Sequence, residues 1–541
     1  MKDKVLLIIT AFFTLIVISQ EDAWVYFNAK ENVAYAIANP ITILTQKAID
    51  RKDLHNVVID FRDVPVDETY IADLKNTVGI TVLAKTKWFN AVHVLGTEED
   101  INNLLFKNFV SHIEFFNRNL NASRSIVTKN KFEVENKQTE FIYGNATNQT
   151  EMINVDDLHA LGYTGEGVII AALDTGFGRV NTMSGFQRIR DAGKILGTYD
   201  FYTRSTNVYI DDACCYHGTV TLSTMAGFFE SEFTGTAPDA SYYLFRTDNY
   251  DLDETFTDTP IEETLWIEAA ERADSLGADI ISSSLGFLKW SEVRYNYSPS
   301  DLDGKTSFIT RGADMASEKG ILVVNSAGNQ GSDGLIVPAD AENILTIGAV
   351  NSAGDYMNWS SQGNYLYQDF QKPDVMAQGW QNAVIHESDV VSVAHGTSYS
   401  SPIVAGAVAC LWQALPNKTN AEIMQLVKES ASQYNAPDNY LGYGIPDFGT
   451  ALNLGLTFEK ESFNHINVFP NPIKNILKIK FPSHIEKVNF ELYDILGNLV
   501  MNKNTLRDSE TINFEQLTSG IYFLKVRDSN LNINTFKLIK E

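Results

Sequence analysis

The chain reads Val168-Ile-Ile-Ala-Ala-Leu-Asp-Thr-Gly176, six apolar residues followed by a carboxylate and a glycine. An apolar run without alternation is typical of a strand buried on both faces of a parallel sheet. Similar runs recur downstream, with helical patterns between them, so we expect a doubly wound α/β domain over residues 151–457 with a mostly parallel sheet. The further strand runs are Asp279–Ser284, Ile321–Ser326 and Ile344–Val350, and the helical patterns are Glu262–Leu276 and Ala313–Lys319.

Three polar motifs lie where such a domain places its sites, at the carboxyl ends of strands or the starts of helices. Asp174 ends the first strand, and His217-Gly-Thr precedes the helical pattern Val220–Met225. The segment Gly396-Thr-Ser-Tyr-Ser-Ser-Pro402 opens an apolar helix, Ile403–Trp412. A serine at the start of a buried helix lies near unpaired backbone N–H groups, which favour developing negative charge.

The motifs Asp-Thr-Gly, His-Gly-Thr and Gly-Thr-Ser-x-x-x-Pro, in this order, resemble those of the subtilisin-like serine proteases, the subtilases, over about 300 residues. The segment around Asn329 resembles the oxyanion-hole segment of that family, and Lys372–Val375 and Gly442–Asp447 resemble its supporting segments. Two departures are Val220-Thr-Leu222 after the histidine motif and Tyr399-Ser400 after the serine. Neither position transfers a proton, so we expect altered packing there and retained activity.

The resemblance implies a role for each residue. His217 would take the proton of the Ser398 hydroxyl and later give it to the leaving amine. Asp174 would hold the other imidazole nitrogen protonated and stabilise the imidazolium. The side-chain amide of Asn329 and the backbone N–H of Ser398 would donate to the oxyanion. His395, three residues before Ser398, is interpreted as a local residue and not as the base.

The resemblance also implies two substrate-binding segments. Ser283-Ser284-Leu285-Gly286 would pair with the extended substrate backbone, and Ser326-Ala327-Gly328 would line the first specificity pocket. Because these residues are small, we expect an open pocket that accepts large apolar or aromatic side chains.

The N-terminal part predicts an export signal and a pro-domain. A short cationic start precedes an apolar run from Val5 to Ile18, too short to span a membrane, so residues 1–19 are interpreted as a signal peptide. Residues 20–150 are expected to form an α+β pro-domain that ends in an exposed polar linker, 119–150. Its expected strands are Asn56–Phe61, Ile80–Leu83 and Ala91–Leu95, and Thr97 is expected to cap a helix through Phe106.

The C-terminal part differs in charge from the rest. Residues 460–541 hold 11 Lys and Arg against 9 Asp and Glu, so this segment carries +2 of the net −26 and the remainder carries −28. Short β-type runs separated by turns predict a small all-β sandwich over residues 458–541. The segments Val468–Pro472, Tyr493–Gly497 and Gly520–Phe523 resemble the C-terminal sorting domain of the Bacteroidetes type IX secretion system. The expected strands are Ile476–Phe481, Asn489–Tyr493, Asn498–Met501, Ile521–Val526 and Thr535–Ile539.

Composition excludes several other classes. The strong negative charge argues against a nucleic-acid partner, and no stretch after residue 18 is long and apolar enough to span a membrane. Three cysteines build no disulfide framework; Cys214 and Cys215 could pair with each other, and Cys410 is expected to be a small buried residue. No cofactor is expected. The acid clusters Asp248–Glu254 and Asp258–Glu263 are solvated faces or ligands of structural calcium.

The sequence therefore predicts a secreted serine endopeptidase that acts on proteins or peptides through an acyl-enzyme intermediate. The alternative is an inactive subtilase-like surface binding protein. The expected partners of the protein are its own pro-domain and the type IX secretion machinery. Its expected destination is the cell surface or medium. We expect the pro-domain and the tail to be removed in two separate cuts.

Overall fold

The computed structural model describes residues 19–121, 141–211, 215–248, 258–364, 366–464, 467–480, 488–495, 498–505, 509–528 and 533–541. The signal peptide expected at residues 1–19 lies outside this set except for Ser19, as does Cys214. The chain forms two compact units, Met1–Ala451 and Leu452–Glu541.

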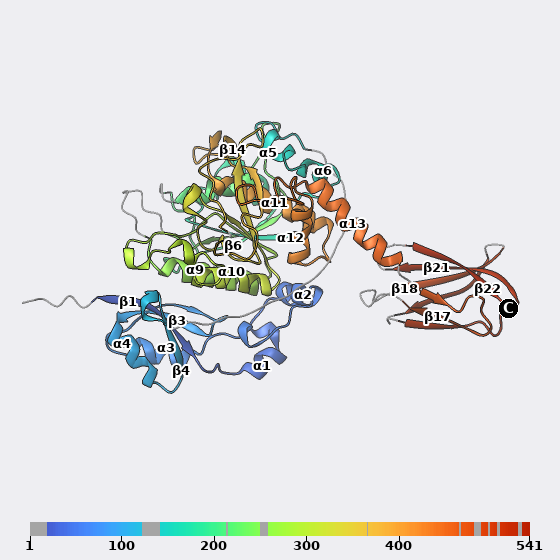
Figure 1. Cartoon of the computed structure of the whole chain (residues 1–541), viewed down its shortest axis with the longest axis horizontal. Coiled ribbons are helices and arrows are strands. Elements are labelled where there is room, and N and C mark those ends of the chain that lie inside the picture. The colour runs from blue at the N-terminus through green and yellow to red at the C-terminus, as the bar shows by residue number, and fades with distance from the viewer. Residues whose placement is uncertain are drawn as a thin grey trace, which may run out of the picture. The chain divides into compact units, whose positions relative to one another are not determined.

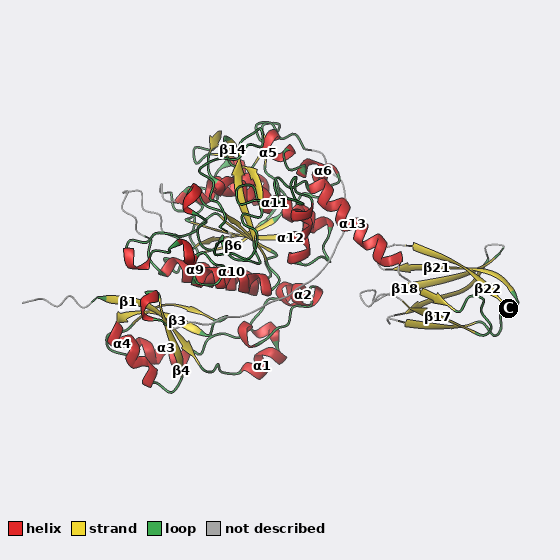
Figure 2. Ribbon diagram, viewed as in Figure 1, coloured by secondary structure: helices red, strands yellow, loops and turns green. Residues whose placement is uncertain are grey.

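The first unit is built on a seven-stranded sheet in the order β13-β12-β11-β10-β5-β9-β6, and every pairing in it is parallel (Figure 2). The doubly wound α/β prediction is confirmed. The four expected strands are neighbours within the sheet and are buried along their whole length, which is why their sequences are largely apolar. The strands are β5 Ile169–Asp174, β6 Ile195–Asp200, β9 Ser241–Arg246, β10 Ile280–Ser283, β11 Leu322–Ser326, β12 Leu345–Val350 and β13 Val375–Gln378.

The sheet changes winding direction beside β5. After β5 the chain builds β6 and β9 on one side, and then β10 to β13 on the other. In the resulting register Ser283 of β10 lies opposite both Leu173 of β5 and Asn325 of β11. The carboxyl ends of these three strands therefore meet at the point where doubly wound sheets bind their ligands.

Helices cover both faces of this sheet (Figure 1). On one face α9 and α10 pack together, and their apolar core includes Ile169, Ala171 and Leu173, the alternate residues of β5. On the other face α8 packs against α11, which runs along β10 to β13. The helices of this domain are α5 Thr147–Glu151, α6 Val155–Ala160, α7 Gln187–Asp191, α8 His217–Ala226, α9 Ile261–Leu276, α10 Phe308–Glu318, α11 Thr397–Ala414, α12 Asn420–Glu429 and α13 Phe448–Asn464. Short antiparallel pairs are formed by β7 Phe228–Phe229 with β8 Phe233–Thr234 and by β14 Asn382–Ile385 with β15 Val391–Ala394.

The N-terminal region folds as an antiparallel four-stranded sheet in the order β2-β3-β1-β4. Two of its strands match the expected ones, while β1 and β4 were not anticipated. The helix cap at Thr97 is confirmed, because its hydroxyl accepts the backbone N–H of Asp100. The elements are β1 Gln20–Phe27, β2 Thr81–Thr86, β3 Ala91–Thr97 and β4 Val110–Phe115, with α1 Val33–Ala38, α2 Gln46–Leu54, α3 Glu68–Lys75 and α4 Glu98–Asn103.

Two expectations for this region are wrong. The strand predicted at Asn56–Phe61 is irregular and leads into a 3-10 helix, Phe61–Asp63, because Asp60 and Asp63 form a capping box around that turn. The exposed linker predicted over residues 119–150 lies largely outside the described residues, but its end forms α5. Gln149 and Thr150 are buried there, and Gln149 hydrogen-bonds the backbone of Ala383 on β14.

The second unit begins with the larger part of α13, and from Asn467 onward it is all β, as expected. Its sheets have the orders β16-β17-β20 and β19-β18-β21-β22, and their apolar side chains form a core of their own. The strands are β16 Asn467–Phe469, β17 Ile476–Lys480, β18 Val488–Asp494, β19 Leu499–Thr505, β20 Ser509–Asn513, β21 Gly520–Asp528 and β22 Ile533–Lys540. Within the described part of the chain, no helix has the length and apolar character needed to cross a membrane.

Candidate active site

An aspartate and a histidine are joined at the carboxyl end of β5. Nδ1 of His217 lies 2.7 Å from Oδ1 of Asp174. The same carboxylate accepts the backbone N–H of Thr175 at 2.8 Å and the hydroxyl of Thr221 at 3.0 Å. These bonds hold the carboxylate in one orientation, so Nε2 is the imidazole nitrogen left for other partners.

The close approach of α8 to β5 explains the glycine after the histidine. A Cβ placed on Gly218 would lie 2.2 Å from the carbonyl oxygen of Gly176 and 2.8 Å from Cβ of Asp174. Any larger residue would therefore push the first turn of α8 away from β5 and lengthen the bond between His217 and Asp174.

The charge of His217 is controlled by Asp174. Burial lowers the pKa of the imidazole, but the charge and hydrogen bond of Asp174 outweigh burial, and the net effect raises the pKa above its ordinary value. The Asp174 side chain is 3% exposed and the His217 side chain 33%, so the acceptor is enclosed while the imidazole reaches solvent.

Ser398 is the second residue of α11, and α11 packs against α8, the helix that begins at His217. The hydroxyl of Ser284, which follows β10, donates to the carbonyl oxygen of Ser398 at 2.8 Å. The ring of the next residue, Tyr399, has its centroid 6.1 Å from that of His217. The starts of α8 and α11 therefore face each other beside the end of β10.

Asn329 is oriented by the residue before the serine. Its Oδ1 accepts the backbone N–H of Thr397 at 3.0 Å and the Thr397 hydroxyl at 3.1 Å. A Cβ placed on Gly396 would lie 3.6 Å from Nδ2 of Asn329 and 3.8 Å from the backbone nitrogen of Ser398. Two N–H donors thus flank the same small space, which a side chain at position 396 would partly fill.

The two segments expected to bind substrate contain both buried and accessible residues. Ser283 is fully buried and its hydroxyl accepts Nε1–H of Trp266 at 3.1 Å, so this side chain faces the core. Ser326 and Ala327 are also buried. Ser284, Leu285, Gly286 and Gly328 continue these strands toward the start of α11.

The open pocket expected from these small residues stays a prediction, and one further side chain, that of Ile336, borders both segments. The side chain of Ile336 lies against both Gly286 and Gly328: a Cβ on Gly286 would be 2.6 Å from Cδ1 of Ile336, and one on Gly328 would be 3.0 Å from its Cγ2. The sequence analysis missed Ile336 because no motif marks it and it is far along the chain from Gly286.

The other polar candidates have local roles. His395 accepts the backbone N–H of Gln381 through Nδ1 and stacks on Trp380 with ring centroids 4.0 Å apart. Cys410 is buried, as expected, and burial raises the pKa of its thiol well above the ordinary value. Among the described residues, no group of three or more His, Cys, Asp or Glu side chains could hold a metal ion.

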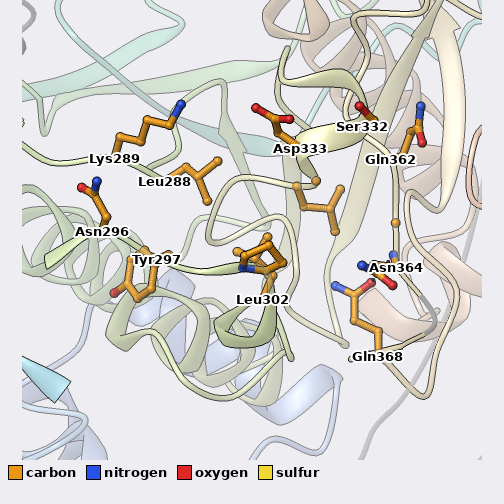
Figure 3. A pocket seen from close by; sticks show the side chains of 14 residues that line it. Leu288, Lys289, Asn296, Tyr297, Leu302, Ser332, Asp333, Gln362, Asn364 and Gln368 are labelled. Carbon is orange, nitrogen blue, oxygen red and sulfur yellow. Dashed lines mark hydrogen bonds between the residues drawn. The ribbon is translucent and has the colours of Figure 1, made fainter. Parts of the chain in front are cut away.

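A cavity of about 460 Å³ lies elsewhere on the same domain (Figure 3). Its lining includes Leu288, Tyr297 and Leu302 together with the polar side chains of Asp333 and Gln368. None of the site residues expected from the sequence lines it.

A parallel sheet with a polar site at its switch point defines an α/β enzyme. Residues 165–444 match the Subtilase family, more than half of the chain, and the protein belongs to this family of serine endopeptidases. Residues 22–135 match the Peptidase S8 propeptide domain of Bacteroidota, and residues 467–541 match the Secretion system C-terminal sorting domain. The protein is therefore a zymogen-type protease that the sorting domain directs through type IX secretion to the cell surface or extracellular space.

Individual relatives agree with the family match. The chain is 31% identical over 299 residues to subtilisin E of Bacillus subtilis (strain 168), an alignment that covers 54% of this chain and 68% of that protein. It is equally similar to subtilisin of Bacillus pumilus, of which 94% is covered. The crystal structure of MycP1 from Mycobacterium smegmatis is 20% identical, with a TM-score of 0.43 over 60% of this chain and 89% of that one.

Proposed function

We propose that Asp174, His217 and Ser398 form the catalytic triad of this protease and that it cleaves peptide bonds through an acyl-enzyme. The observation that carries this proposal is the 2.7 Å bond between Nδ1 of His217 and Asp174, with Ser398 at the start of the facing helix. A serine hydroxyl becomes a nucleophile only when a base takes its proton, and a neutral imidazole fixed by a carboxylate is suited to that task.

Asn329 is assigned to the oxyanion. Because both bonds from Thr397 go to its Oδ1, its Nδ2 is left as the donor of this side chain. Donors held in place before the reaction stabilise the tetrahedral intermediate without a reorganisation cost. The segments 283–286 and 326–328 are assigned to substrate binding. The side chain of Ser283 lies in the core, so this residue contributes by holding its segment in place. The proposed reaction requires no cofactor, and structural calcium has no role in it.

Labelling with a fluorophosphonate tests the nucleophile. We expect the processed enzyme to carry one adduct, located on Ser398 by peptide mass spectrometry, and Ser398→Ala to carry none. Ser400→Ala is the matched control, since it lies in the same helical turn and its hydroxyl bonds only the backbone of Thr397. An unlabelled wild type would favour the inactive binding protein instead. If maturation is autocatalytic, Ser398→Ala should also keep residues 20–150 while still losing the tail from about residue 458.

The pro-domain is proposed to hold the protease inactive through a set of buried charges. Arg51 and Lys52 of α2 both contact Asp274 of α9, at 2.5 and 2.7 Å. Nearby, Lys319 at the end of α10 contacts Asp63 of the pro-domain at 2.7 Å. These side chains are fully or almost fully buried. Although burial opposes it, the charges of Lys52 and Arg51 hold the pKa of Asp274 well below its usual value.

Replacing Asp274 should weaken the binding of the pro-domain to the peptidase domain without lowering the activity of the mature enzyme. In Asp274→Asn the buried Arg51 loses its anion, while Lys52 retains Asp63 at 3.2 Å. A buried cation left without its anion costs about 3–5 kcal/mol, so the dissociation constant of the processed complex should rise on the order of 10²–10³ or more. The activity recovered on serial dilution measures this constant.

The control for this test is Glu318→Gln. Glu318 pairs with Arg62 of the pro-domain across the same interface, but both side chains are partly exposed. Such pairs contribute about 0–1 kcal/mol, so the constant should change by less than about fivefold. Equal effects of the two variants would contradict the role assigned to the buried charges.

A further inference from the structure

We infer that Ile336 forms the floor of the first specificity pocket and restricts this protease to substrates with a small side chain before the cleaved bond. The inference rests on the proposed function, which assigns segments 283–286 and 326–328 to the walls of that pocket. It names the substrate class that those walls admit.

Backbone hydrogen bonds hold Ile336 between the two walls. Its N–H donates to the carbonyl oxygen of Ala327 at 3.2 Å. The next residue, Val337, exchanges two bonds of 2.9 Å with Phe287, which follows Gly286. The strand-like segment at Ile336 is therefore attached to one wall on each side, and its backbone is held between the two walls.

The positions of Gly286 and Gly328 show where the side chain of Ile336 lies. Cδ1 and Cγ1 of Ile336 lie 2.6 Å from the position of a Cβ on Gly286, and Cγ1 and Cγ2 lie 3.0 Å from one on Gly328. Distances under 3.0 Å are not tolerated between real carbon atoms, so Gly286 must lack a side chain for Ile336 to fit. The isoleucine thus occupies the space between the walls that a large substrate side chain would need.

The small exposed fraction of Ile336 agrees with its place at the floor of the specificity pocket. It is 9% exposed, whereas the preceding Leu335 is 1% exposed and the following Val337 is fully buried. Ile336 is thus the residue of this segment that keeps a small accessible surface. A glycine, alanine or serine side chain could rest on that surface, while a phenylalanine or leucine side chain would collide with it.

Chromogenic tetrapeptides that differ only in the last residue test the inference. We expect the wild type to cleave the alanine substrate with a kcat/KM on the order of 10² above that of the phenylalanine substrate, since pocket fit of this kind discriminates 10–200-fold. Ile336→Ala should reduce or invert this ratio, and Ile336→Val should shift it in the same direction by a smaller factor. The ratio does not depend on the concentration of active enzyme, so it can be read even from a variant that folds in low yield.

The control is Ile347→Val on β12, which removes the same methyl group from a buried site outside the pocket. It should leave the ratio unchanged. A wild type that prefers phenylalanine, or a ratio unmoved by either Ile336 variant, would overturn the inference while leaving the triad intact. Failure of the triad would instead appear as loss of fluorophosphonate labelling in the wild type.

Discussion

Replacing His217 by alanine is expected to lower kcat by about 10⁶, the loss known for the base of this class of enzyme. The variant leaves the hydroxyl of Ser398 without a proton acceptor and the leaving amine without a donor. Single-turnover hydrolysis of a peptide ester and a peptide amide measures the loss, and the amide should suffer at least as much because its leaving group must be protonated. The residual activity should also lose the acid limb of the pH profile that His217 produces in the wild type.

His395→Ala distinguishes the proposed base from its neighbour. His395 is close to Ser398 in sequence, but its Nδ1 accepts the backbone N–H of Gln381 and its ring stacks on Trp380. We expect a far smaller loss of kcat than in His217→Ala. Equal losses in the two variants would show that the base has been misassigned.

Asp174→Asn is expected to lower kcat by about 10⁴, because the amide no longer holds Nδ1 of His217 protonated and so favours the wrong tautomer. The pH profile provides a second readout. In the wild type Asp174 raises the pKa of His217, and the base works only when neutral, so activity is gained as the pH rises through this raised value. Without the carboxylate charge of Asp174, burial lowers the pKa of the imidazole against the charge of Asp248 only, so the acid limb should move to lower pH.

Thr221→Val is the control for this prediction. It removes a hydroxyl that donates to Oδ2 of Asp174 but leaves the carboxylate charge in place. The loss of kcat should be much smaller and the acid limb should move little. An Asp174→Asn variant whose acid limb moves to higher pH would contradict the electrostatic role of Asp174.

The fold of the peptidase domain was predictable where strands are buried on both faces. The strands β5, β10, β11 and β12 are largely apolar because they are buried between helices on both faces of the sheet. The edge strand β6 was missed because it is half-exposed and contains Gly197, so its sequence lacks that signal. In the N-terminal region local capping by Asp60 and Asp63 overrode the β-type pattern of the preceding residues.

The sequence by itself determined the class of the protein and predicted the residues of its site. Asp174, His217, Asn329 and Ser398 each stand in a short motif, because each must be placed by the residues next to it: a strand end, a helix start or a glycine that permits close approach. Such local requirements leave a mark in consecutive residues. The separate C-terminal part was also predictable, since the charge of the chain changes near residue 460.

Only the tertiary structure showed which side chain lies between the proposed substrate-binding segments and which charges join the pro-domain to the peptidase domain. Ile336 lies between Gly286 and Gly328 because its N–H bonds the carbonyl of Ala327 and the next residue, Val337, pairs with the distant Phe287. No local pattern encodes that pairing. Likewise, nothing in the sequence distinguishes Asp274 from the other acidic residues of α9. Only the folded chain shows that Arg51 and Lys52 of α2 contact it. Contacts between distant segments carry the information on specificity and inhibition, so they emerge only when the chain is folded.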